Sequence, residues 1–335
     1  MPTPTAGPPG TAELLAAAHV VALPLRVPFR GIVVREAVLL AGPLGWGEFA
    51  PFVEYDDAEA ARWLAAAVEA GWQGWPPPVR ADVAVNATVP AVAAAEVPGV
   101  LARFPGCTTA KVKVAQAGQR LADDLDRVAA VREVLGPGGA VRVDANAAWG
   151  VEEAARALAA LAPYRLQYAE QPCATVAELA QLRVALARSG VDVPIAADES
   201  IRKATDPRRV ALAGAADIVV VKVAPLGGVR AALEVAEACG LPVVVSSALD
   251  TSVGIAAGVA LAAAVPSLPF ACGLGTAALL AADVVPTPLL PVGGALSVAA
   301  ASGLAADSRL LAEHAAAPAR RDRWLARLRR CAELL

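Results

Sequence analysis

Three acidic residues each close a short run of β-forming residues. Asp144 follows Ala140-Val-Arg-Val, Glu170 follows Tyr168-Ala, and Asp198 follows Ile195-Ala-Ala. The intervals from 144 to 170 and from 170 to 198 are 26 and 28 residues, the length of a strand plus a helix. Such a repeat is typical of a (β/α) barrel, in which the carboxyl ends of the strands meet at one site. Three carboxylates at one site predict a divalent cation, Mg²⁺ or Mn²⁺.

Three lysines lie near the ends of two predicted strands on opposite sides of the barrel. Lys111 and Lys113 are separated by one residue, so the period of a strand places both amines on the same inward face. Two close cations lower each other's pKa and burial adds to this effect, which would make one of them a base near neutral pH. Lys222 ends the apolar run Ile218–Val221, where a buried amine needs a partner. We expect Lys222 to lie across the metal site from the other two.

Each of these residues also has an ordinary structural explanation. A single acid after a strand is typical of a helix N-cap or an ion pair, and two lysines on one face also suit an exposed edge strand. Three acids in register on adjacent strands favour the catalytic interpretation.

The elements that position these groups begin near Asp82, where the chain changes to a strand–helix rhythm. Near-continuous apolar strands between amphipathic helices predict a buried parallel sheet, and eight such strands close most naturally as a barrel. The predicted strands are Val83–Val85, Ala110–Val114, Val141–Val143, Leu166–Tyr168, Ile195–Ala197, Ile218–Val223, Val243–Val245 and Phe270–Cys272.

The first part of the chain has an antiparallel α+β character. Val20–Leu25 and Val33–Leu40 predict strands, Asp57–Gly71 predicts a helix, and the Arg-rich end predicts an amphipathic final helix. The fold class is therefore α/β: a modified (β/α)8 barrel of the (β/α)7β type with a split α+β capping domain. The predicted domains are a disordered leader at 1–11, the first part of the cap at 12–80, the barrel at 81–285, and a segment at 286–335 that returns to the cap.

Composition argues against several classes of protein. The longest uncharged apolar run, Val253–Val265, is too short to span a bilayer, and a net charge of −3 without a basic cluster in the barrel does not suit nucleic-acid binding. Five cysteines without a C-x-x-C pair predict neither a disulfide framework nor a zinc site. His19 and His314 lie outside the barrel, so a His-dependent hydrolase lacks its imidazole. We expect a cytoplasmic enzyme for a small-molecule carboxylate, either a monomer or a small homo-oligomer.

Five short motifs together resemble the enolase superfamily, in the subgroup that includes muconate lactonizing enzymes. They are Lys111-x-Lys113, Asp144-x-Asn146, Glu170-Gln-Pro172, Asp198-Glu-Ser200 and Lys222. Within the subgroup the chain is most similar to the o-succinylbenzoate synthase family of menaquinone biosynthesis. The features that carry this likeness are Pro28-Phe-Arg30-Gly31, Arg142-Val-Asp144-Ala-Asn146-x-x-Trp149 and Ser246-Ser-Ala-Leu-Asp-Thr-Ser-Val-Gly254.

The resemblance implies a role for each group. Asp144, Glu170 and Asp198 would bind the metal. Lys113, with Lys111 beside it, would remove a proton α to a carboxylate, and Lys222 would stabilise the resulting enediolate from the other face. Loss of the β-hydroxyl would complete a syn-dehydration of 2-succinyl-6-hydroxy-2,4-cyclohexadiene-1-carboxylate to o-succinylbenzoate. The residues expected to contact substrate or support the site are Arg30, Arg142, Asn146, Glu199, Ser246, Ser247, Gly273 and Gly275.

Two alternatives stay open at this level. An N-succinylamino acid racemase or a dipeptide epimerase would use Lys113 and Lys222 to exchange an α-proton on the same scaffold, so the two lysines do not separate these activities. A non-catalytic barrel acting as a binding module would bury three acids and three lysines without using them, at a cost in desolvation.

Overall fold

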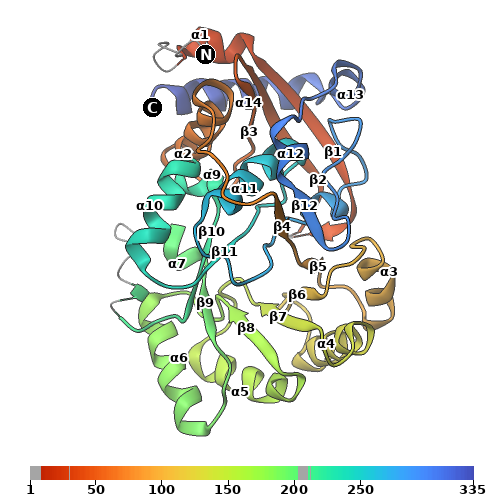
Figure 1. Cartoon of the computed structure of the whole chain (residues 1–335), viewed down its shortest axis with the longest axis vertical. Helices are drawn as coiled ribbons and strands as arrows, with labels where there is room; N and C mark the ends of the chain where they lie inside the picture. Colours follow the sequence, from red (N-terminus) through yellow and green to blue (C-terminus); the bar gives the residue numbers. More distant parts are fainter. Residues whose placement is uncertain (1–8, 30, 203–209, 212) are drawn as a thin grey trace.

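The computed structural model of the chain describes residues 9–29, 31–202, 210–211 and 213–335. Figure 1 shows a barrel at the bottom of the view and a cap at the top, which contains the first and the last of the described helices. None of the described helices is both long and apolar enough to cross a membrane.

A parallel sheet of seven strands forms the barrel, in the order β11-β10-β9-β8-β7-β6-β5. The segment around Cys272 closes the gap between the first and last strands, because Cys272 bridges in parallel to Val85 and Gly273 bridges in parallel to Ser246. The modified barrel predicted from the sequence is confirmed. The strands are β5 (Ala87–Val89), β6 (Thr109–Lys113), β7 (Ala140–Asp144), β8 (Leu166–Glu170), β9 (Ile195–Ala197), β10 (Ile218–Val221) and β11 (Val243–Val245).

Two predicted barrel strands are corrected by the structure. Val83–Val85 overlaps β4 (Asp82–Ala84), which pairs antiparallel with β12 (Ala295–Ser297) outside the barrel sheet; only Val85 takes part in the closure, through its bridge to Cys272, so β5 is the first strand of the sheet. Phe270–Cys272 forms isolated bridges and no strand. A short apolar run does not specify its partner, and tertiary contacts decided the pairing in both places.

Amphipathic helices cover the outside of the barrel sheet (Figure 1). In α4 and α5 the buried faces include Val128, Val131, Leu158 and Leu161, the apolar periodicity that a helix on a sheet requires. Burial of each such side chain stabilises the fold by about 1.5–3 kcal/mol. The barrel helices are α3 (Val97–Leu101), α4 (Leu121–Leu135), α5 (Val151–Leu161), α6 (Val176–Ser189), α7 (Glu199–Arg202), α9 (Val223–Leu226), α10 (Val229–Cys239) and α11 (Ser252–Ala264).

The cap is an antiparallel sheet of β1 (Ala18–Phe29), β2 (Ile32–Gly42) and β3 (Gly45–Phe49), packed on α2 (Asp57–Val68) and α14 (Pro318–Ala332). Asp56 is the N-cap of α2, since its side chain accepts from the amide of Glu59 at 2.7 Å. Gly47 permits β3 to approach α2 closely, because a Cβ there would lie 2.1 Å from the carbonyl oxygen of Ala67. The remaining described elements are α1 (Thr11–Ala16), η1 (Glu69–Gln73), η2 (Ala94–Glu96), η3 (Ala162–Tyr164), η4 (Thr276–Leu279), α12 (Val298–Ser302) and α13 (Ser308–Glu313).

Candidate active site

The predicted acids and lysines meet at the carboxyl ends of the barrel strands. Lys113 pairs in register with Asp144, and Asp144 pairs with Glu170 on the next strand. Asp198 directly follows β9, and Lys222 directly follows β10. The side chains of the three acids are each 1% exposed, so their carboxylates are almost completely shielded from solvent.

Each of the three amines contacts a carboxylate. Lys111 Nζ donates to both oxygens of Glu170 at 2.8 Å and lies 3.1 Å from Asp144 Oδ2. Lys113 Nζ donates to the same Asp144 oxygen at 2.5 Å. Lys222 Nζ donates to Asp198 Oδ2 at 2.5 Å. Because Lys111 and Lys113 both reach Asp144, the prediction that they share one face of their strand is confirmed.

The two neighbouring lysines have pKa values shifted in opposite directions. Burial lowers the pKa of Lys113, and the charge of Lys111 adds to this against the opposing charge of Asp144. Burial also acts to lower the pKa of Lys111, but the charges of Glu170 and Asp144 outweigh it and raise that pKa well above its ordinary value. The prediction that both amines become weaker acceptors of a proton is therefore wrong for Lys111. Of the two amines, Lys113 therefore loses its proton more readily.

The carboxylates are also not equivalent. Burial acts to raise the pKa of Asp144, but the charges of Lys113 and Lys111 outweigh it and hold that pKa well below its usual range. Burial and then the negative charge of Asp144 raise the pKa of Glu170 to about 7. Glu170 therefore takes up a proton more readily than Asp144 does.

Asn146 links Lys113 to a further acid, Glu199. Its Oδ1 accepts from Lys113 Nζ at 2.6 Å, and its Nδ2 donates to Glu199 Oε1 at 3.5 Å. Its backbone N–H donates to Asp144 Oδ1 at 3.0 Å. The structure thus brings Asn146 and Glu199 to the edge of the charged cluster, where Asn146 orients both Lys113 and Asp144.

Gln171 is a buried residue to which sequence reasoning assigned no role. Its Oε1 accepts from the backbone amides of Asp198 at 2.9 Å and Ser200 at 3.2 Å, while its Nε2 donates to Ser200 Oγ at 2.7 Å. These bonds fix the end of β9 to the end of β8. The only feature of the sequence that pointed to Gln171 was its position directly after Glu170.

Arg142 lies fully buried in the barrel interior. Its guanidinium donates to Asn86 Oδ1 at 3.1 Å and to the carbonyl oxygen of Ala271 at 2.7 Å, and it lies 4.7 Å from the ring centroid of Tyr168. Its Nε donates to Gln167 Oε1 at 2.7 Å. Arg142 therefore ties β7 to the segment that closes the barrel.

A central cavity adjoins the charged cluster, and about 30 Å³ of it is open to a water-sized molecule. Thr88, on β5 in register with Lys111, lines it with a buried hydroxyl that has no hydrogen-bond partner within the described ranges. Such a hydroxyl is available to a ligand. The residues that line the central cavity are Phe29, Phe52, Thr88, Lys111, Lys113, Asn146, Lys222, Ser246, Ser247, Ala248, Leu249, Gly273 and Thr276.

Only some of the other predicted contact residues line the central cavity. Ser246, Ser247 and Gly273 line the central cavity, and Ser247 Oγ donates to the Gly273 carbonyl oxygen at 2.7 Å. Gly275 instead packs near the Asn86 carbonyl oxygen and the ring of Phe104. Arg30 lies outside the described residues.

Comparison with known proteins identifies the class. Residues 20–71 match the family described as Enolase N-terminal domain-like, and residues 93–309 match that described as Enolase C-terminal domain-like. The chain therefore belongs to the enolase superfamily. The muconate lactonizing enzyme from Pseudomonas putida has the same fold, with a TM-score of 0.73 and 22% identity over 89% of this chain and 98% of that one. An N-succinyl Arg/Lys racemase from Bacillus cereus also has this fold, with a TM-score of 0.73 and 18% identity over 90% of this chain and 97% of that one.

More similar relatives define the family within that class. The chain is 62% identical to an o-succinylbenzoate synthase from Thermobifida fusca over 277 residues, which cover 83% of this chain and 86% of that protein. It is 58% identical to an o-succinylbenzoate synthase from Mycobacterium tuberculosis over 329 residues, which cover 98% of this chain and 97% of that protein. Within the superfamily, the chain belongs to the o-succinylbenzoate synthase family.

Proposed function

We propose that this chain catalyses the dehydration of 2-succinyl-6-hydroxy-2,4-cyclohexadiene-1-carboxylate to o-succinylbenzoate, a step of menaquinone biosynthesis. The observation that carries the proposal is the 58% identity to an enzyme of that name over 98% of the chain. The placement of buried acids and lysines at one end of the barrel supports it, because a carbon acid next to a carboxylate needs both a base and stabilisation of negative charge.

In this mechanism Lys113 is the base. Its side chain lines both the central cavity and a neighbouring groove that contains Phe29, and burial favours its neutral form. The neutral amine takes the proton α to the substrate carboxylate. The electron pair left behind forms the new ring double bond as the β-hydroxyl departs. The protonated amine returns its proton to that hydroxyl, which leaves as water, so one group serves both steps of a syn-elimination.

The other two lysines supply positive charge. Lys222 reaches the site from β10, on the far side of Asp198 from β8, and stabilises the negative charge that develops when the α-proton is removed. Lys111 keeps its proton because Glu170 and Asp144 surround it. It neutralises the cluster beside the base and takes no part in proton transfer.

Asp144, Glu170 and Asp198 are the residues that would hold a divalent cation. They provide only carboxylate oxygens, which are the donors that Mg²⁺ and Mn²⁺ prefer, and they come from three adjacent strands. Burial and then the charges of Asp144 and Asp198 raise the pKa of Glu170 to about 7, and a divalent cation beside this carboxyl would favour its charged form. When bound, the cation supplies a Lewis acid for the substrate carboxylate, which lowers the barrier to loss of the α-proton.

Binding of a cation by these carboxylates also requires the lysines to move. Within the described ranges, no three His, Cys, Asp or Glu side chains are grouped closely enough to hold a metal ion, and the amines of Lys111, Lys113 and Lys222 contact the carboxylates instead. Metal binding therefore requires amines to withdraw from carboxylate oxygens, so we expect Mg²⁺ affinity to fall as Lys113 becomes protonated.

The decisive experiment offers the purified protein two substrate classes with Mg²⁺ in D₂O. With the cyclohexadiene acid we expect aromatic product, followed by ultraviolet absorbance, and loss of turnover when EDTA removes the metal. With N-succinyl amino acids we expect no deuterium at the α-carbon. Deuterium exchange without formation of aromatic product would replace the dehydratase by a racemase on the same scaffold.

A further inference from the structure

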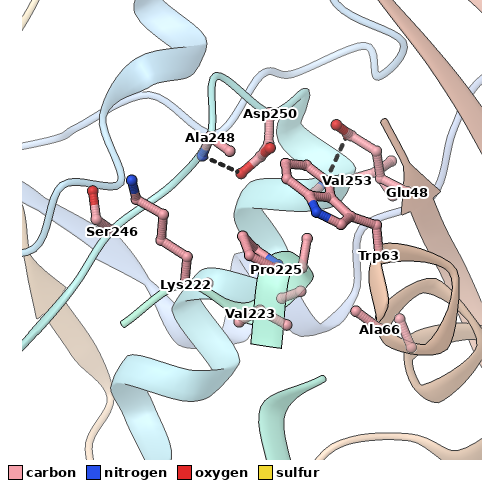
Figure 2. Close-up of a pocket in the computed structure, with 15 residues that line it drawn as sticks. Glu48, Trp63, Ala66, Lys222, Val223, Pro225, Ser246, Ala248, Asp250 and Val253 are labelled. Carbon is pink, nitrogen blue, oxygen red and sulfur yellow. Dashed lines mark hydrogen bonds between the residues drawn. The ribbon is translucent and has the colours of Figure 1, made fainter. Parts of the chain in front are cut away.

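A second cavity lies behind Lys222, between the cap and the barrel. Figure 2 shows Glu48 and Trp63 entering it from the cap, with Lys222, Ser246 and Asp250 on the barrel side. About 30 Å³ of this space is open to a water-sized molecule, the same as in the central cavity. Lys222 and Ser246 also line the central cavity, so this polar space adjoins the proposed active site.

Glu48 connects the cap to a barrel helix. Its Oε2 accepts from the backbone amides of Thr251 at 3.0 Å and Gly254 at 3.1 Å, and from the Thr251 hydroxyl at 2.5 Å. Thr251 is the N-cap of α11, so a carboxyl group from β3 satisfies amides at the start of that helix. The other oxygen, Oε1, is buried and has no hydrogen-bond partner in the described part of the chain.

Asp250 places a second buried carboxyl beside the first. Its Oδ2 accepts from the amide of Ala248 at 3.0 Å (Figure 2). Both carboxyl-bearing side chains press on Gly254, where a Cβ would lie 2.6 Å from Asp250 Cβ and 2.9 Å from the Glu48 carboxyl carbon. Burial and then the charge of Asp250 raise the pKa of Glu48 to about 8, and burial raises the pKa of Asp250. The charged groups that face this pair are Arg35 from β2 and Lys222 from the end of β10.

The loop from Ser246 to Asp250 needs such support because its backbone is strained. Leu249 has φ +65°, a left-handed conformation that costs a residue of this type about 1–3 kcal/mol unless its surroundings enforce it. Arg35 Nε donates to the Leu249 carbonyl oxygen at 3.0 Å, and its guanidinium lies 4.6 Å from the ring centroid of Phe52. Residues 246 to 249 and Phe52 all line the central cavity.

We infer that Glu48 is a positioning residue that shares one proton with Asp250 and thereby holds the loop 246–250 in its substrate-binding shape. The inference rests on the proposed function, because the loop matters to catalysis only if the central cavity binds the substrate. One shared proton leaves the pair with a single negative charge, which Arg35 balances. Loss of that proton at alkaline pH puts two buried negative charges side by side and weakens the support of the loop.

The test is the pH dependence of KM, measured apart from kcat in the Mg²⁺-loaded enzyme. If only the protonated pair holds the loop, about a tenth of the enzyme is competent one pH unit above a pKa of about 8, so KM at about pH 9 rises roughly tenfold. Glu48→Gln keeps the hydrogen bonds without a titrating group, so we expect its KM near neutral pH to match that of the wild type and the alkaline rise to vanish. Glu48→Ala should raise KM at every pH.

Glu69→Gln is the matched control. Glu69 is another buried carboxylate of the cap region that caps a barrel helix, since it accepts from the backbone amides of Val229 and Arg230 at the start of α10. It has no contact with the loop 246–250 among its hydrogen bonds. Glu69→Gln should therefore keep the wild-type pH profile of KM, whereas a similar change in both variants would show that any loosening of the cap has this effect and would overturn the inference.

Hydrogen exchange of the amides at 246–250 gives a readout that needs no turnover. After correction for intrinsic rates, wild-type protection should fall between about pH 7 and about pH 9, and protection in Glu48→Gln should not. Equal protection of the two proteins at both pH values would refute the role of Glu48. Absence of turnover together with the expected exchange pattern would refute the proposed reaction and leave the proton-dependent loop in place.

Discussion

Replacing Lys113 with alanine should separate the chemistry from the fold. The amine is lost, but Asp144 keeps Lys111 at 3.1 Å, so no buried carboxylate is left without a cation nearby. Lys113 also borders two cavities, so truncation enlarges existing space and creates no sealed void. We therefore expect the free energy of unfolding to change by less than about 1 kcal/mol. A general base contributes about 10²–10⁴-fold, and the loss here should be at least that large because the same amine also protonates the leaving group.

The assay is steady-state dehydration combined with Mg²⁺ titration and urea denaturation of the same preparation. A loss of about 10³-fold in kcat raises the barrier by about 4 kcal/mol, while Mg²⁺ affinity should stay within a few-fold of the wild type. Lys111→Ala is the matched control. It removes the donor to both oxygens of Glu170, so it should destabilise the fold by about 3–5 kcal/mol. Near-normal turnover in Lys113→Ala would show that the base has been assigned to the wrong residue.

Three further predictions concern the metal, a buried ion pair and pH. Asp198→Asn should weaken Mg²⁺ binding by at least about tenfold in calorimetric titration, because it removes a charged oxygen ligand; unchanged affinity would exclude Asp198 from the metal site. Arg127→Met should cost about 3–5 kcal/mol in urea denaturation, because Arg127, 1% exposed, pairs with Asp124 at 2.8 Å and donates to the Lys113 carbonyl oxygen at 2.9 Å. The pKa of Glu48 is about 8 in the folded protein against an ordinary value of 4.5, so between these values the folded state holds more protons and stability falls as pH rises. Wild type should thus unfold at lower urea near pH 8 than near pH 5, and a pH response in Glu48→Gln equal to the wild type would contradict this.

The charged cluster was predictable because it obeys local rules. Asp144 and Glu170 end apolar strands, and the carboxyl ends of parallel strands meet at one edge of the sheet whatever the details of the loops. The two-residue period of a strand was enough to place Lys111 and Lys113 on one face. The sign of the pKa shift at Lys111 was not predictable, because it depends on Glu170 reaching the amine from two strands away.

Features that depend on distant pairings were missed. Thr88 lies on β5, which pairs with β6 as the first strand of the barrel sheet. The run predicted for that place, Val83–Val85, overlaps β4, whose antiparallel partner β12 lies near the end of the chain. Glu48 and Asp250 lie 202 residues apart (250 minus 48), and nothing in either local sequence signals that one caps the helix following the other.

The most direct test of the account is a crystal structure with Mg²⁺ and o-succinylbenzoate bound. We predict one metal ion bound by oxygens of Asp144, Glu170 and Asp198 at about 2.0–2.1 Å, with the Lys113 and Lys222 amines on opposite faces of the product. If the three carboxylates instead keep their lysine partners and the ion binds elsewhere, the proposed site of catalysis is contradicted.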